Sequence, residues 1–313
     1  MFRFRPLRSA QRRRHLRALW TSTRPLSAAP TPTNGDAAFA LGVKYLLGKA
    51  KGHAGSAMAV QNVVLHWTSA AEMGHVRAQG ALGTLYLTGY ANLPRNLPLA
   101  LEFLQKAADA GDSKSCYEMG KLFFHGSQDE EDERPRDLNR TLHYWTRAAE
   151  QGHVAANFDL GRLYAEGLHV TQDQEKAVQF YRQAAKHELP EAQWALGTAY
   201  LLGRGVETSA HHATKCFRRA AEAGHARAQF DLAACYMLGR GIELDHDKAA
   251  HFFFLAAESG LVEAQLCLAQ LFETGRGVPV NRDKAIEYYR LAAKGGLKEA
   301  TQALDRLGAP REP

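Results

Sequence analysis

One arrangement of small, aliphatic and aromatic residues recurs along most of the chain. A small residue is followed four positions later by a large aliphatic residue, and four positions after that by an aromatic one. The small residues are Ala37, Ala78, Ser115, Ala156, Ala192, Ala228 and Ala264, with a partial last copy at Ala300. They lie 41, 37, 41, 36, 36, 36 and 36 residues apart. A nearly constant period of this length indicates a repeat protein built from one supersecondary unit.

The first half of each unit is predicted to be a helix, helix A. Positions one, five and nine share one face because an α-helix has about 3.6 residues per turn. Position five holds Leu41, Leu82, Met119, Leu160, Leu196, Leu232 and Leu268, and position nine holds Tyr45, Tyr86, Phe123, Tyr164, Tyr200, Tyr236 and Phe272. Position six is Gly in five units and Ala in the last two. Since Gly weakens a helix by about 1 kcal/mol, its recurrence predicts a neighbouring helix too close for a larger side chain.

The second half of each unit is predicted to be another helix, helix B. Its core face carries adjacent aromatic residues, as at Tyr144 and Trp145, followed by two alanines. A Gly such as Gly203 follows helix A and one such as Gly224 follows helix B, where left-handed C-caps favour this residue. The pattern therefore predicts an all-α array of about seven helix–loop–helix repeats of about 36 residues.

The combined pattern, A-x-x-x-L-G-x-x-Y-x-x-G-x-G-V followed by K-A-x-x-x-Y-x-x-A-A-x-x-G, resembles the Sel1-like repeat, a relative of the tetratricopeptide repeat. The resemblance covers roughly residues 37 to 307 and is clearest between Ala264 and Ala300. It implies a right-handed α/α solenoid, which we place at residues 34–308 with a capping helix at 299–307 and a tail at 309–313. The family implies adaptor and assembly-factor roles without a shared reaction.

Positive charge is concentrated before the repeats. The chain has a net charge of +6, and eight of its 39 basic residues are arginines within the first 24 positions. The remaining 31 basic residues stand against 33 acidic ones, and the first acid is Asp36. An acid-free, Arg-rich and Ser-rich leader with an amphipathic stretch around Leu16 and Trp20 is typical of a mitochondrial presequence, here residues 1–33. The alternative is a basic disordered tail. No nucleic-acid partner is expected for the repeats.

Helix A has a second apolar stripe, roughly opposite the first, at positions three and ten. A ladder of this kind would suit a helical or extended peptide of a partner protein. The candidate partner-binding residues are Tyr117, Phe158, Trp194, Leu201, Phe230 and Met237. The alternative is packing, because a helix between neighbours in a solenoid is apolar on both sides.

Little in the sequence suggests chemistry. His75, His153 and His225 follow a unit-closing Gly and suggest a role at the turn, and the pair at His211 and His212 lacks the further ligands of a metal site. No nucleophile motif or phosphate-binding loop is recognisable, so we expect no metal, cofactor or small-molecule substrate. No apolar run is long enough to span a membrane. Five acids at 129–133 indicate a solvated loop or, alternatively, a docking patch for a basic partner.

The four cysteines show no paired spacing. Cys216 and Cys235 occupy core positions of their helices and are expected to be buried, whereas Cys116 and Cys267 are expected to be at least partly exposed. The resemblance to cysteine-rich relatives of the mitochondrial intermembrane space leaves a disulfide between neighbouring repeats as an alternative.

These observations favour a non-enzymatic, protein-binding scaffold. We expect an assembly or chaperone-like factor of the mitochondrial matrix or intermembrane space that binds a client on the solenoid surface. One alternative is a stable structural subunit of a large organellar complex, and a less favoured one is an enzyme.

The leader can be tested directly in cells. If residues 1–33 form a presequence, the mature protein should begin downstream of Arg24. Deletion of residues 1–30 should then leave the protein in the cytosol, as measured by fractionation and N-terminal sequencing. Recovery of the intact N-terminus from mitochondria would contradict the prediction.

Overall fold

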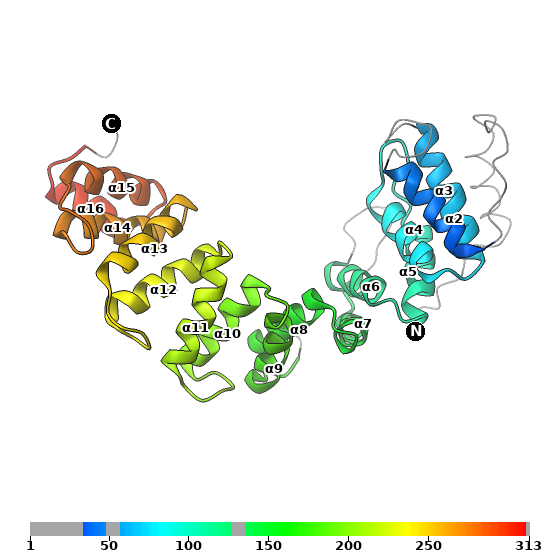
Figure 1. Ribbon diagram of the computed structural model, residues 1–313, viewed down its shortest axis with the longest axis horizontal. Helices are drawn as coiled ribbons and strands as arrows, with labels where there is room; N and C mark the ends of the chain where they lie inside the picture. The colour runs from blue at the N-terminus through cyan, green and yellow to red at the C-terminus, as the bar shows by residue number, and fades with distance from the viewer. Residues whose placement is uncertain (1–33, 48–56, 127–134, 169, 311–313) are drawn as a thin grey trace. The chain divides into compact units, whose positions relative to one another are not determined.

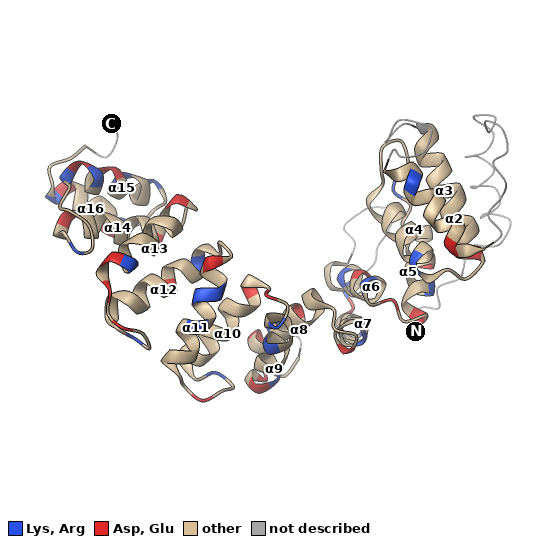
Figure 2. Cartoon of the chain, viewed as in Figure 1, with Lys and Arg blue, Asp and Glu red and all other residues tan. Residues whose placement is uncertain are grey.

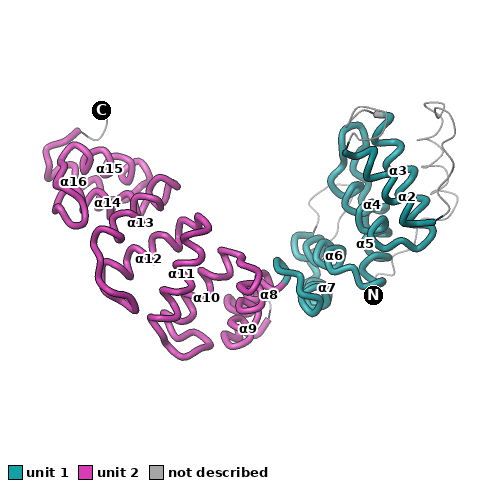
Figure 3. The backbone as a smooth tube through the Cα atoms, in the orientation of Figure 1, with its two compact units in different colours: residues 1–156 teal, residues 157–313 magenta. Residues whose placement is uncertain are grey.

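The computed structural model describes residues 34–47, 57–126, 135–168 and 170–310, and these residues form an all-α solenoid of helix–loop–helix repeats. The predicted leader and the acidic run at 129–133 lie outside the described residues. Within these limits there are fifteen helices (Figure 1). The chain divides into two compact units, residues 1–156 and 157–313 (Figure 3).

Helices A and B alternate along the chain. The A helices are α2 (Gly35–Leu46), α4 (Val76–Thr88), α6 (Ser113–His125), α8 (Val154–Glu166), α10 (Pro190–Leu202), α12 (Ala226–Leu238), α14 (Val262–Thr274) and α16 (Lys298–Arg306). The B helices are α3 (Ala57–Glu72), α5 (Leu97–Asp109), α7 (Leu138–Glu150), α9 (Gln174–Ala185), α11 (Ala210–Glu222), α13 (His246–Glu258) and α15 (Arg282–Lys294). Each predicted repeat is therefore one A–B pair, and α16 lies where the last helix was expected.

The close approach predicted at position six is confirmed. A Cβ placed on Gly161 would lie 2.6 Å from Cδ1 of Tyr181, and one on Gly197 would lie 2.7 Å from Cδ1 of Phe217. In the first compact unit, residues 1–156, a Cβ on Gly120 would lie 2.2 Å from Cδ1 of Trp145. In these repeats the second residue of the helix-B aromatic pair, or Phe217 alone, thus rests on the bare backbone of helix A in its own repeat.

The first residue of the helix-B pair stacks on the position-nine aromatic ring of helix A. Six pairs have ring centroids 5.6–6.2 Å apart and interplanar angles of 5–13°: Tyr45–His66, Tyr86–Phe103, Phe123–Tyr144, Tyr164–Phe180, Tyr236–Phe252 and Phe272–Tyr288. In the repeat where Cys216 replaces the aromatic residue, Tyr200 stacks instead on His212 at 5.2 Å. Offset parallel rings at these distances add stability beyond the apolar area that they bury.

The loops of the last repeats rest on the preceding repeat. Gly203, Gly239 and Gly275 end their A helices in the left-handed conformation, as predicted. A second Gly, two residues later, packs against the start of the previous B helix, and a Cβ on Gly241 would lie 2.3 Å from the carbonyl oxygen of Ala210. Thr214, in the same earlier helix, donates a hydrogen bond from Oγ1 to the carbonyl of Gly241 at 3.2 Å.

A buried Gln at position two joins four of the repeats to the one before it. Nε2 of Gln193 donates to the carbonyl oxygen of Ala185 at 2.7 Å, and Gln229 bonds Ala221 in the same way at 3.2 Å. These bonds satisfy carbonyls at the C-terminus of helix B, which have no partner inside that helix. Cys116 occupies the equivalent position and is fully buried, so the expectation that it is partly exposed was wrong. The position looks polar in sequence because it caps a neighbouring helix.

The other cysteines differ in burial, and all four are free thiols. Cys235 is buried, as expected from its core position, whereas Cys216 is only partly buried. Cys267 is also partly buried, which agrees with the expectation of partial exposure.

The glycine contact can be tested with Gly161→Leu. The added side chain must displace the ring of Tyr181, and we expect overpacking to lower the free energy of unfolding by about 3 kcal/mol. Gln179→Leu on α9 adds a similar side chain at an exposed position and should change stability by about 0.5 kcal/mol or less. Equal shifts of the two variants in urea denaturation would contradict the proposed contact.

Candidate functional site

The A helices of the second unit are joined side by side by polar contacts between consecutive repeats. Nε1 of Trp194 donates to Oδ2 of Asp231 at 2.7 Å and joins α10 to α12. Arg227 pairs with Glu263 at 3.0 Å and joins α12 to α14. Arg306 donates to both carboxylate oxygens of Glu273, at 2.7 and 2.8 Å, and joins α14 to α16. We call the surface formed by α10, α12, α14 and α16 the A-helix face.

Four of the predicted partner-binding residues lie together on this face. Trp194, Leu201, Phe230 and Met237 are all partly buried and pack at the margin of one hydrophobic core. The ring of Phe230 meets Phe253 edge-on, with centroids 5.4 Å apart. One side of each residue therefore serves packing, and part of each side chain stays accessible to solvent.

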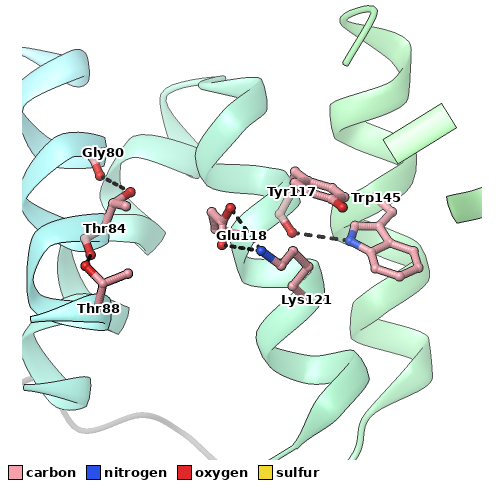
Figure 4. Close-up of polar contacts among 7 residues, drawn as sticks. All are labelled: Gly80, Thr84, Thr88, Tyr117, Glu118, Lys121 and Trp145. Carbon is pink, nitrogen blue, oxygen red and sulfur yellow. Dashed lines mark hydrogen bonds and ion pairs between the residues drawn. The ribbon is translucent and has the colours of Figure 1, made fainter. Parts of the chain in front are cut away.

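The other two predicted residues also contact a helix-B aromatic ring, but they lie on other A helices, α8 and α6. Phe158, on α8, lies 5.9 Å from the ring of Tyr181 and is partly buried. Tyr117 belongs to the first unit, where its ring stacks on Trp145 and its carbonyl oxygen accepts a hydrogen bond from Nε1 of Trp145 at 3.2 Å (Figure 4). Lys121 lies over the same ring at 5.5 Å. The structure thus groups Trp194, Leu201, Phe230 and Met237, and it leaves Tyr117 in the other unit.

Polar side chains on α6 and α4 make contacts within their own helices. Glu118 and Lys121 form an ion pair with an N–O distance of 3.1 Å one turn apart on α6 (Figure 4). On α4, the hydroxyls of Thr84 and Thr88 each donate to the carbonyl four residues earlier, at 3.0 Å (Figure 4). Each of these contacts joins two residues of the same helix.

Asp231 is a feature that the sequence analysis missed. Burial raises the pKa of its carboxyl group, against the opposing effect of the hydrogen bond from Trp194. The position is held by Ala, Glu, Asp or Cys in the different repeats, so no periodic signal marks it. The carboxylate fixes the indole of Trp194 toward α12, because a half-buried charged acceptor makes a stronger hydrogen bond than a neutral one.

The repeated histidines are helix N-caps. Nδ1 of His225 accepts the backbone N–H of Ala228 at 3.1 Å, and the ring stacks on Trp194 with centroids 5.6 Å apart. His75 and His153 accept the equivalent N–H groups at 3.0 and 3.2 Å. The role at the turn expected from the sequence is therefore capping. No group of three potential metal ligands occurs among the residues that the structure describes.

A cavity of about 680 Å³ opens on the A-helix face between α12, α14 and α16. Its lining combines apolar groups, such as Met237 and Leu271, with the amides of Gln270 and Gln302. Tyr289 donates to Glu273 at 2.6 Å at its edge. A volume of this size is typical of sites that hold a small molecule or a few side chains of a peptide.

The thiols near this face are poorly suited to nucleophilic chemistry. Burial raises the pKa of Cys267, which lines the cavity, to about 11, and that of Cys235 to about 11. Both are therefore protonated at neutral pH, whereas the thiolate is the reactive form. The arrangement of aromatic, apolar and amide groups is suited to binding. No helix in the described ranges is both long and apolar enough to cross a membrane.

Comparison with known proteins agrees with this architecture. A family model of the Sel1 repeat matches residues 76–112, 113–153, 154–188, 190–225, 226–261 and 262–297. Each matched segment contains one A–B helix pair, from α4–α5 to α14–α15. No curated protein matches the chain.

Two solved structures are similar over most of the chain. A protective antigen of uropathogenic Escherichia coli with an SLR fold is 28% identical, with a TM-score of 0.79 over 87% of this chain. The chain spans only 56% of that protein. A Sel1 repeat protein from Oxalobacter formigenes is 32% identical, with a TM-score of 0.67 over 87% of this chain and 76% of the other.

The cap formed by His225 predicts a dependence of stability on pH. Burial lowers the pKa of this histidine below its usual 6.5, so the folded state favours the neutral ring that accepts the N–H of Ala228. Its contribution should be complete above pH 6.5 and be lost as the pH falls through the lowered folded value. His225→Asn keeps a capping acceptor that does not titrate.

The measurement is urea denaturation of both proteins between pH 7.5 and 5. We expect the wild-type protein to lose more of its free energy of unfolding than the variant over this range. Identical pH dependences would show that His225 does not contribute in this way.

Proposed function

Because this chain belongs to the Sel1 repeat family, we propose that it is a non-enzymatic scaffold that holds a client protein on the A-helix face of its second unit. Sel1 repeat proteins serve as protein-interaction scaffolds. The observation that carries the proposal is the grouping of Trp194, Phe230 and Met237 at the margin of one core, where Met237 also lines a cavity of about 680 Å³. Interfaces concentrate their binding energy in aromatic and other large apolar residues at such places.

The polar groups of the face support binding more than catalysis. Glu273 accepts hydrogen bonds from the hydroxyl of Tyr289 and from Arg306, which donates to both carboxylate oxygens. Asp231 accepts one from the indole of Trp194. Carboxylates held in this way stiffen the surface but are not poised as general bases. A stiff surface lowers the entropic penalty of association, because fewer side chains must be ordered on binding.

We further propose that the client is mitochondrial and that the protein acts in assembly or as a chaperone-like factor. This part rests on the Arg-rich, acid-free leader, and therefore on sequence alone. Crosslinking in intact mitochondria, followed by mass spectrometry, tests it. Crosslinks from α10, α12 or α14 to one protein would support the proposal. An exclusively cytosolic distribution would refute the compartment but not the scaffold role.

The binding face is tested by the double substitution Trp194→Ser with Phe230→Ser. If these residues anchor the client, capture of the protein identified by crosslinking should weaken at least tenfold, because interface aromatics commonly contribute about 2 kcal/mol or more. Leu232→Ala is the matched control, since this side chain is fully buried and should affect the melting temperature alone. Thermal melting is measured on every variant.

Two results decide between binding and packing. Lost capture with a largely preserved melting transition supports the proposed face. A collapsed transition, similar to that of Leu232→Ala or worse, would show that Trp194 and Phe230 are core residues.

A further inference from the structure

Three arginines occupy the same place in consecutive repeats of the second unit. Arg204, Arg240 and Arg276 each follow the Gly that ends an A helix and precede the Gly that packs on the previous B helix. Both glycines of each loop are left-handed, with φ between +62° and +74°. Because the backbone on either side is the same, the three arginines start from equivalent positions on one edge. We call this edge the arginine rim.

The rim lies along the A-helix face. Arg276 lines the cavity together with Met237 of α12. Arg240 is near enough to Cys235 of α12 to oppose the effect of burial on the pKa of that thiol. All three arginines are exposed, and none is paired with a carboxylate within the described residues. Basic and acidic residues are otherwise interspersed over the helices of this unit (Figure 2).

Exposed leucines accompany the arginines. Leu202 and Leu238, two residues before Arg204 and Arg240, are 53% and 64% exposed. A positive charge after a helix C-terminus is favourable to the helix dipole, which gives the arginines a reason to be there without any ligand. The dipole does not account for leucines exposed at the same edge. Adjacent apolar and basic groups are instead what an apolar, acidic ligand requires.

Carboxylates follow two of the three arginines in sequence. Glu207 and Glu243 come three residues after Arg204 and Arg240, beyond the second Gly of each loop. At the start of the next B helix, Asp245 is the main cause of the raised pKa of Lys248, and Glu243 adds a smaller effect in the same direction. The third loop has Pro279 at this position.

A row of equivalent positions favours an extended ligand. The three arginines come one repeat apart, at intervals of 36 residues, so an extended segment that runs along the row can meet one loop after another. A polyproline II segment rises about 3.1 Å per residue with three residues per turn. Every third residue of such a segment therefore lies on one face and is displaced by about 9 Å.

We propose that the arginine rim binds an extended, acidic segment of the client protein, with a carboxylate at every third position and an apolar side chain beside each carboxylate. The carboxylates would pair with Arg204, Arg240 and Arg276, and the apolar side chains would cover Leu202 and Leu238 and enter the cavity beside Met237. The inference rests on the proposed function. A nucleic-acid strand fits less well, because the rim offers it no aromatic ring for base stacking and would leave the leucines uncovered.

The experiment measures fluorescence polarisation of labelled synthetic peptides with the full-length protein. The test peptide is four copies of Glu-Leu-Pro, which favours polyproline II and places Glu at every third position. One control peptide has the same composition in scrambled order, and another has Lys in place of Glu. A single-stranded oligonucleotide is the fourth probe. Each titration is repeated at low and at high salt, because rim charges are screened.

The protein variant reverses the rim with Arg204→Glu, Arg240→Glu and Arg276→Glu. A matched control reverses three other exposed cations of the second unit, with Lys215→Glu, Arg218→Glu and Lys294→Glu. We expect the periodic acidic peptide to bind the wild-type protein and the control variant alike. The rim variant should bind it at least tenfold more weakly and should prefer the Lys peptide. Melting curves of both variants show whether each is folded.

Several results would overturn the inference. These are equal binding of the scrambled acidic peptide, preference for the oligonucleotide, absence of peptide binding, or equal losses in the two variants. Failure here is distinguishable from failure of the proposed function. A rim variant that still captures the crosslinked client, while the Trp194 and Phe230 double variant does not, would refute the rim and leave the scaffold role intact.

Discussion

The structure depends on one contact that recurs in the five repeats with Gly at position six: a large helix-B side chain rests on helix-A backbone that carries no side chain. Where helix A has Gly, as at Gly120 and Gly161, the facing ring of Trp145 or Tyr181 occupies the space that a Cβ would need. Where it has Ala233 or Ala269, the following B helix supplies Phe253 or Tyr289 to the same core. This contact brings the two helices of a repeat close together. The position-nine ring of helix A can then stack on the first residue of the helix-B pair, as Tyr164 does on Phe180.

The same contact determines what is left for binding. One side of helix A packs on the B helices. Its N-terminus is capped by a side chain such as His225, and its position-two amide, as at Gln193, caps the C-terminus of the preceding helix B. The remaining side carries Trp194, Phe230 and Met237, which pack on the core, and a hydrogen bond to Asp231 fixes the indole of Trp194. In such an array, binding therefore depends on side chains that pack on the core with one side and expose the other side to solvent. This explains why a candidate site is made of half-buried side chains instead of a separate pocket in the core.

The sequence predicted the features that repeat and missed those that depend on neighbours. The period, the two helices and the small residue at position six occur in every repeat, so comparison of the repeats reveals them. The pairing of Trp194 with Asp231 joins residues 37 positions apart and occurs once, so no periodic signal points to it. Cys116 was misjudged because a polar residue at position two, Gln in most repeats, suggests exposure, although its amide is buried against a helix end. The leader's role and the client's identity depend on partners outside the chain.

The loops that rest on the previous repeat give the array a direction. Gly205, Gly241 and Gly277 each pack against the start of the B helix in the repeat before, at Gln174, Ala210 and His246. A loop can reach its final form only once that earlier helix is in place, whereas the earlier helix does not need the loop in order to form its own pair. Chain synthesis delivers the repeats in this same order, N-terminal first. The B helix on which each loop packs is therefore synthesised before that loop. The repeats can fold in the order in which they leave the ribosome.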